Sequence, residues 1–205
     1  MSARTQLARE ERAAKTREEL LASAAQAVGE LGYRDTSIQR ITAGAGLAQG
    51  TFYLYFESRQ AIFDELLPYF GQQMLDRIAE RVHGARGLFE VEELGARALF
   101  EYLHQNPWFW RVLNEAEVEA PVAWRRHHDE VARRYLKFLK RARTDGELSD
   151  YAESELGTLA HLLIAARDYI YVHHLIKRTR RDVTVPESMI KTYMKFIRHG
   201  LGRRR

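Results

Sequence analysis

Apolar residues recur at helical spacing along almost the whole chain. In the segment 16–31, for example, Leu20, Ala24, Val28 and Leu31 lie three or four positions apart, which places them on one face of an α-helix. A strand would show β-branched residues alternating with polar ones, and no stretch of this sequence has that pattern. The pattern therefore predicts an all-α fold.

Glycines, prolines and capping residues divide this pattern into about nine helices, three short ones followed by six longer ones. Ser58 is the expected N-cap of the fourth helix. Pro68 lies inside that helix and has no amide hydrogen to donate to the carbonyl of Asp64, so we expect a kink or a break there. The expected helices span about residues 16–31, 36–44, 49–55, 59–82, 91–105, 108–116, 121–144, 150–178 and 186–200.

The second and third short helices are typical of a helix-turn-helix, the unit with which many proteins bind DNA. Thr36 begins a capping-box pattern that ends at Gln39. Ala45-Gly46 supplies a turn with a permissive backbone. Gly50 leaves the start of the third helix without a side chain, so its backbone can approach DNA closely.

A fixed order of residues runs through this segment, and the order is more specific than any single residue in it. The order comprises Gly32-Tyr33, Thr36-Ser37, Ile41, Ala45-Gly46, Gly50-Thr51-Phe52-Tyr53, Tyr55-Phe56 and Ser58-Arg59. It resembles the pattern of the tetracycline-repressor (TetR) family, over about residues 16–67. The remainder of the chain agrees with the family only in the number and lengths of its helices. The resemblance implies a DNA-binding domain over residues 14–67 and a ligand-binding and dimerisation domain over residues 68–205.

The resemblance also implies which residues contact DNA. Gln49 and Gly50 would face base edges in the major groove, where a glutamine side chain is suited to adenine. Hydroxyl and guanidinium groups would hold phosphates. The resulting DNA-binding set is Ser37, Ala48, Gln49, Gly50, Thr51, Tyr53, Tyr55 and Arg59.

Three residues of the helix-turn-helix depart from the family pattern. Ala48 stands where the family has Ser or Thr, so the third helix loses a side-chain N-cap worth about 0.5–2 kcal/mol. Gly44 lies inside the second helix, where it costs about 1 kcal/mol relative to Ala. Thr42 replaces a small apolar residue beside the buried face. These departures bear on affinity and specificity rather than on the fold.

The second domain is expected to form a homodimer and to hold a ligand. The resemblance places the dimer interface on the helices at about 150–178 and 186–200, whose apolar sides would make a four-helix contact. The alternative is that these sides belong to the core of one subunit. The residues concerned are Leu156, Leu159, Leu163, Ala166, Ile170 and Leu175, with Ile190, Tyr193, Met194 and Ile197.

Aromatic residues gather near the helix break at Asn106-Pro107 and recur on later helices. They predict an apolar pocket between helices, with plain core packing as the alternative. Arg167 and Asp168 interrupt an apolar helix, where they would pair with each other or meet a ligand. The segment 106–117 resembles a stretch of family members tied to fatty-acid or acyl-CoA metabolism, which implies an apolar, acyl-CoA or lipid-like effector. The predicted pocket residues are Tyr102, Trp108, Phe109, Tyr135, Phe138, Asp168 and Tyr169.

Composition and charge change this picture little. The chain has 205 residues, 45% of them hydrophobic and 29% charged, no cysteine, no apolar run of membrane-spanning length and no apolar leader, which together fit the cytoplasm. The net charge is +4, but residues 1–60 hold eight Lys/Arg against seven Asp/Glu. The densest basic clusters, 177–181 and 203–205, are typical of a solvated helix end and tail. Arg4, Arg9 and Arg12 could reach DNA from an N-terminal arm, although termini more often lack fixed structure.

These observations favour a repressor that an effector releases from double-stranded operator DNA. A helical enzyme is the first alternative, but the sequence has no nucleophile elbow, phosphate loop or metal-ligand pattern. We expect no cofactor, and no metal either, because neighbouring histidines on a helix point about 100° apart. The second alternative is a ligand-binding or protein-binding module whose helix-turn-helix no longer binds DNA. A mobility-shift titration separates the regulator from the enzyme. Replacing Tyr53 and Arg59 with Ala would leave the activity of such a module unchanged. The metal-ligand candidates considered were Glu115, Glu117, Glu119, His127, His128, His173 and His174.

Overall fold

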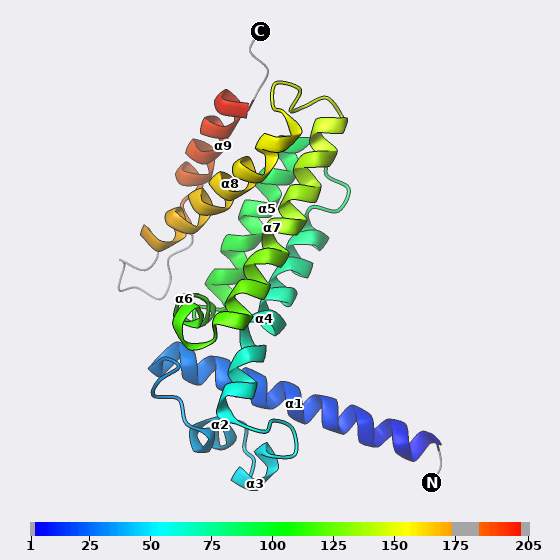
Figure 1. The fold of residues 1–205 in the computed structure, drawn as a ribbon, viewed down its shortest axis with the longest axis vertical. Coiled ribbons are helices and arrows are strands. Elements are labelled where there is room, and N and C mark those ends of the chain that lie inside the picture. The colour runs from blue at the N-terminus through cyan, green and yellow to red at the C-terminus, as the bar shows by residue number, and fades with distance from the viewer. Residues whose placement is uncertain (1–2, 174–184, 202–205) are drawn as a thin grey trace. The chain divides into compact units, whose positions relative to one another are not determined.

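The computed structural model describes residues 3–173 and 185–201. Over these residues the chain forms nine α-helices and one 3₁₀ turn, without a strand, which confirms the all-α prediction (Figure 1). The elements are α1 (Ala3–Leu31), α2 (Ile38–Gly44), α3 (Gln49–Phe52), α4 (Arg59–Arg81), α5 (Leu88–Gln105), α6 (Phe109–Glu119), α7 (Pro121–Thr144), η1 (Glu153–Glu155), α8 (Leu156–Tyr171) and α9 (Glu187–Leu201). No helix in the described ranges combines the length and apolarity needed to cross a membrane.

The helices group into two compact units. The first unit joins residues Met1–Gly71 to Asn106–His127, so it contains α1 to α3, the first half of α4, α6 and the start of α7. The second unit comprises Gln72–Gln105 and His128–Arg205, so it contains the rest of α4 and α7 together with α5, α8 and α9. The helix-turn-helix therefore shares its unit with a segment from the middle of the sequence.

The first helix begins well before residue 16, where the sequence pattern predicts it. It starts at Ala3, so the expectation of an N-terminus without fixed structure is wrong. Residues 4–15 are all exposed, and the helix there draws on good helix formers rather than on packing. Side-chain pairs one turn apart add support, such as the hydrogen bond from Gln6 to Glu10 at 3.2 Å.

The capping residue of α2 is Ser37 and not Thr36, so the predicted capping box is wrong. Ser37 has an extended backbone, and its Oγ accepts a hydrogen bond from the amide of Arg40 at 3.1 Å. The Thr36 hydroxyl is buried and donates instead to the carbonyl of Gly32 at 2.7 Å. Thr36 thus ties the loop back onto the end of α1.

Helix α4 runs without a break through Pro68, so of the expected kink or break the break does not occur. A proline removes one hydrogen bond of the helix, at a cost of about 3 kcal/mol, but the residues on either side can hold the helix by packing. Leu66, Leu67 and Phe70 are all buried around it. The predicted N-cap of α4 is confirmed, because the Oγ of Ser58 accepts from the amide of Ala61 at 3.1 Å.

The helix expected over 150–178 begins later, at Leu156, after the turn η1. The structure describes it as α-helix up to Tyr171. Leu175 and the basic clusters 177–181 and 203–205 lie outside the described residues. The boundaries expected for α7 and α9 agree with the structure to within one residue.

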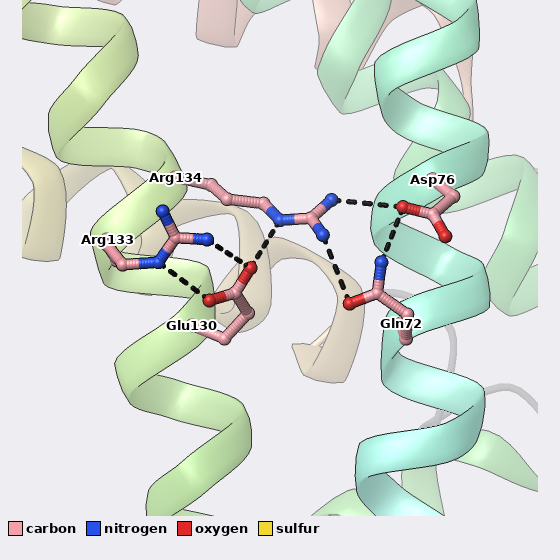
Figure 2. A network of polar contacts seen from close by, with 5 residues as sticks. All are labelled: Gln72, Asp76, Glu130, Arg133 and Arg134. Atoms are coloured by element: carbon pink, nitrogen blue, oxygen red, sulfur yellow. Dashed lines mark hydrogen bonds and ion pairs between the residues drawn. The ribbon is translucent and has the colours of Figure 1, made fainter.

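A polar network on the surface of the second unit joins α4 to α7 (Figure 2). From α7, Arg134 donates to Asp76 at 3.2 Å and to Gln72 at 3.1 Å, both on α4. Within α7, Glu130 accepts from Arg133 and Arg134, each at 2.6 Å in its shortest contact. These hydrogen bonds, that of Arg133 first, lower the pKa of Glu130 from 4.5 to about 2. The network fixes the register of the two helices.

Candidate DNA-binding surface and ligand site

The short helix α3 is held in place by one aromatic residue. Phe52 is fully buried, and its ring lies 5.7 Å from that of Phe56 and 5.5 Å from that of Tyr53. A helix of four residues has almost no stability of its own, so this anchor fixes its orientation. Tyr53 remains 56% exposed, which leaves its hydroxyl free to face outward from the anchor.

Two of the departures from the family pattern have a local explanation. A methyl group on Gly44 would lie 2.3 Å from the Oγ of Ser23 on α1, so glycine allows α1 and α2 to approach. Ser23 uses that approach to donate to the carbonyl of Ile41 at 2.7 Å. Thr42 is buried, and its hydroxyl bonds to the carbonyls of Ile38 and Gln39 within its own helix. Neither residue disturbs the outer face.

The turn between α2 and α3 forms as the sequence predicts. Gly46 adopts a φ of +67°, a backbone conformation that residues with a Cβ rarely adopt. The amide of Gly46 bonds to the carbonyl of Ala43 at 3.1 Å, and that of Leu47 bonds to Thr42 at 2.8 Å. This glycine-terminated helix end sets the angle at which α3 leaves α2.

The structure places seven of the predicted DNA-binding residues at or near the surface of α2, α3 and their caps. A methyl group on Gly50 would meet no atom within 4 Å, so the fold itself does not require glycine there. Ala48 caps α3 without a side-chain hydrogen bond, as predicted from its missing hydroxyl. Exposed members are Ser37, Ala48, Gln49, Gly50 and Tyr53, and half-buried members are Thr51 and Tyr55.

Arg59, the eighth residue of the predicted set, is engaged within the protein. Its Nη1 donates to the carbonyls of Arg34 and Thr36, at 3.0 and 3.2 Å, and the guanidinium lies 5.3 Å from the centre of the Phe63 ring. These contacts tie the loop between α1 and α2 to the start of α4. A phosphate contact by Arg59 stays a prediction, since the guanidinium has further N–H donors.

Helix α6 forms hydrogen bonds with the end of α1 in the first unit, a contact that the sequence pattern did not predict. Glu115 accepts from the amide of Tyr33 at 2.9 Å and from Arg111 at 2.6 Å. Arg111 donates in turn to the carbonyl of Glu30 at 2.8 Å, in the last turn of α1. Charge-assisted hydrogen bonds to a helix end are among the stronger kind. In the sequence, only the four-residue spacing of Arg111 and Glu115 pointed to this contact.

The residues of the predicted pocket are divided between the two units. Trp108 and Phe109 belong to the first, where the Trp108 ring lies 4.7 Å from that of Phe70 and Phe109 is fully buried. Tyr169 belongs to the second but is 66% exposed, and its ring stacks on His173 at 5.3 Å. The members found within the second unit are Tyr102, Tyr135, Phe138, Asp168 and Tyr169.

A buried polar cluster lies where four helices of the second unit meet. Glu92 of α5 accepts hydrogen bonds from the hydroxyls of Tyr135 on α7 and Tyr193 on α9, the latter at 2.6 Å. Arg167 of α8 forms an ion pair with Glu92 at 3.8 Å, and its guanidinium lies 4.7 Å from the centre of the Tyr135 ring. Arg167 and Asp168 do interact electrostatically, but the ion pair of Arg167 is with Glu92 on a helix that is distant in the sequence. Glu92 and Tyr193 were missed as members of this site.

Burial sets the protonation of this cluster. It raises the pKa of Tyr135 and of Tyr193, so both hydroxyls keep the protons that they donate to Glu92. Burial also raises the pKa of the neighbouring Asp168. For Arg167, burial lowers the pKa, but the nearby Tyr135 and Glu92 outweigh it and the net direction is upward. The guanidinium is therefore charged.

Comparisons with known proteins bear on the first unit above all. The sequence profile described as bacterial regulatory proteins, tetR family, matches residues 20–66. The uncharacterized HTH-type transcriptional regulator YvdT of Bacillus subtilis (strain 168) is 36% identical over 77 residues, which cover 38% of this chain and 40% of that relative. Residues 20–66 are thus similar to the tetR family, and the chain spans less than half the length of the curated relatives it matches.

Solved structures extend the likeness to nearly the full length of the chain, as a likeness of fold. The fatty acid degradation regulator FadR from Bacillus halodurans has a TM-score of 0.71 and 21% identity, covering 88% of this chain and 93% of its own. The transcriptional regulator FadR from Bacillus subtilis in complex with stearoyl-CoA has a TM-score of 0.73 and 17% identity, covering 88% and 96%. At these identities the likeness is one of fold alone.

The apolar sides of α8 and α9 that the resemblance assigned to a dimer contact are largely buried within one chain. Leu156, Leu159, Leu163, Ile190, Tyr193, Met194 and Ile197 are buried within one chain. Other apolar side chains of the same helices are exposed: Leu162 by 63%, Tyr169 by 66% and Phe196 by 68%. Sequence periodicity could not rank the two sides, since both carry apolar residues.

Among the described residues, no three His, Asp or Glu side chains are grouped as metal ligands.

Proposed function

We propose that this chain is a transcriptional repressor that binds operator DNA as a homodimer and leaves it when a small apolar effector binds. The observation that carries the proposal is the outer face of α3, where Gly50 is open to contact on a helix anchored by Phe52. A glycine that the fold does not need, at the start of such a helix, suits a backbone that approaches a DNA groove.

The proposed contacts divide into two kinds. Gln49 and Gly50 would reach base edges, while Thr51, Tyr53 and Tyr55 would hold phosphates on either side. Ser37 suits a phosphate as well, because its oxygen accepts the Arg40 amide and its hydrogen is left to donate. Ala48 and Arg59 would lie at the edge of this surface.

The proposed dimer uses the exposed sides of α8 and α9. Leu162, Tyr169 and Phe196 are large apolar residues left in contact with water, and a second copy of the chain would cover them. A two-fold dimer would place two α3 helices on half-sites about 34–36 Å apart, or a multiple of that. Operator sequences should then be close to palindromic.

The proposed effector is an acyl-CoA or a related lipid-like molecule, bound in the second unit. Two proteins of the same fold support this class: a regulator of fatty acid degradation and a regulator bound to stearoyl-CoA. The second unit also contains buried aromatic and polar side chains from four helices. The protein would act in the cytoplasm, where both DNA and acyl-CoA are available.

A mobility-shift titration with DNA selected from the host genome tests the proposal. We expect sequence-specific binding, with an affinity that falls steeply as salt rises because phosphate contacts release counterions. Stearoyl-CoA should then release the DNA. Binding that ignores sequence would contradict the repressor, whereas specific binding that resists every acyl-CoA would contradict only the effector.

A further inference from the structure

One polar atom in the second unit is left unsatisfied by the protein itself. The side chain of Arg167 is 9% exposed, and its Nε has no hydrogen-bond partner. Among the described residues, no other buried side-chain N or O atom lacks a partner. The ion pair with Glu92, at 3.8 Å, is too long for a hydrogen bond. A buried donor without an acceptor is unusual in a native structure and calls for a ligand or another explanation.

The cluster around Arg167 supplies charge but not acceptors. Glu92 balances the charge of the guanidinium, while its two oxygens accept from the hydroxyls of Tyr135 and Tyr193. The ring of Tyr135 lies against the guanidinium and offers its π face, which attracts a cation but accepts no strong hydrogen bond. What Arg167 lacks is therefore a hydrogen-bond acceptor rather than a negative charge.

Gly95 and two apolar side chains lie beside the guanidinium. A methyl group on Gly95 would lie 3.9 Å from the Nη1 of Arg167 and 3.8 Å from each of Ile78 and Val82, all ordinary contact distances. The surroundings of the charged group at this point are thus small and apolar. An apolar molecule carrying one polar acceptor fits such surroundings.

We propose that Arg167 binds a neutral carbonyl oxygen of the effector, as found in an ester, a thioester or an amide. The proposal deepens the function proposed above, since it requires that the effector bind within the second unit. A carboxylate fits less well, because Glu92 already neutralises the guanidinium.

The test uses pairs of ligands that differ only in the carbonyl oxygen. One pair is stearoyl-CoA and its S-octadecyl thioether, and the other is methyl decanoate and methyl decyl ether. Calorimetric titration of the full chain should give a dissociation constant about tenfold lower or more for the carbonyl member of each pair, as expected of a hydrogen bond to a charged donor. In Arg167→Met the ratio within each pair should fall to about one.

Two further variants separate ligand binding from folding. Arg167→Met leaves Glu92 buried without its countercharge, so the double variant Glu92→Gln with Arg167→Met removes both charges together. It should also lose the preference for the carbonyl member. Arg134→Met removes an arginine from the surface network of the same unit and should keep the preference.

Equal affinities within each pair for the unaltered protein would overturn the proposal, and so would a preference that survives in Arg167→Met. Stearate that binds more tightly than methyl stearate would overturn it too. If no carbonyl compound binds, the proposed carbonyl site is wrong, while operator binding is measured independently. If only methyl decanoate shows a preference that depends on Arg167, the carbonyl site is supported and the acyl-CoA effector is wrong.

Discussion

Replacing Gly50 with Ala separates what the fold needs from what DNA binding needs. The added methyl group meets no protein atom within 4 Å, and the Gly50 backbone has no positive φ. An alanine restricts the unfolded chain more than a glycine does, so we expect the free energy of unfolding to rise by about 0.4–1 kcal/mol. Urea denaturation followed by circular dichroism measures this gain.

The same methyl group should weaken operator binding. If the start of α3 approaches a DNA groove, the methyl group displaces contacts worth about 1–3 kcal/mol in each half-site. For a dimer this amounts to about 2–6 kcal/mol, or about 30-fold or more in Kd, as measured by mobility shift. Gly157→Ala is the matched control, since its methyl group also meets nothing within 4 Å but lies on α8. Unchanged operator affinity in Gly50→Ala would refute the assignment of α3 as the DNA-contacting helix.

Three other predictions concern the ends and interior of helices. Ala48→Ser should restore the missing N-cap of α3 and raise the free energy of unfolding by about 0.5–2 kcal/mol in urea, and no change would mean that the α3 amides are satisfied otherwise. Pro68→Ala should return a hydrogen bond to α4, which contributes to both units. The effector concentration needed for release should then change by several-fold, while the affinity of the effector-free protein for operator stays within about twofold. A shift in both quantities, or in neither, would contradict this expectation. The pKa of Glu130 is lowered, so its hydrogen bonds from Arg133 and Arg134 stabilise the fold above pH 4.5, and this contribution should be lost as the pH falls toward 2. Glu130→Gln should lack that part of the pH dependence of the urea midpoint.

Local signals in the sequence were sufficient for the helix-turn-helix. The turn glycine Gly46, the cap Ser58 and the uncapped Ala48 all act through residues within a few positions, and their predicted roles agree with the structure. The choice between Thr36 and Ser37 as the cap of α2 was missed, because it depends on a hydrogen bond from Thr36 to the preceding helix end. The sequence alone does not tell which of two neighbouring hydroxyl residues caps a helix, because the choice depends on their hydrogen-bond partners.

Interactions between distant segments were beyond the reach of periodicity. Gly44 looks like a simple cost to helix stability, yet it makes room for Ser23 on another helix. The ion-pair partner of Arg167 is Glu92 on α5, and not Asp168, its neighbour in the sequence. Trp108 was expected in the ligand pocket but belongs to the unit of the helix-turn-helix, since the chain returns to that unit through α6.

The oligomeric state of the chain on a selected operator duplex tests the central claim most directly. Sedimentation velocity of the protein with labelled DNA should give a complex that contains an even number of chains and disappears when the half-sites are scrambled. A single chain per duplex, or the same complex on scrambled DNA, would contradict the account of a dimer that reads two half-sites.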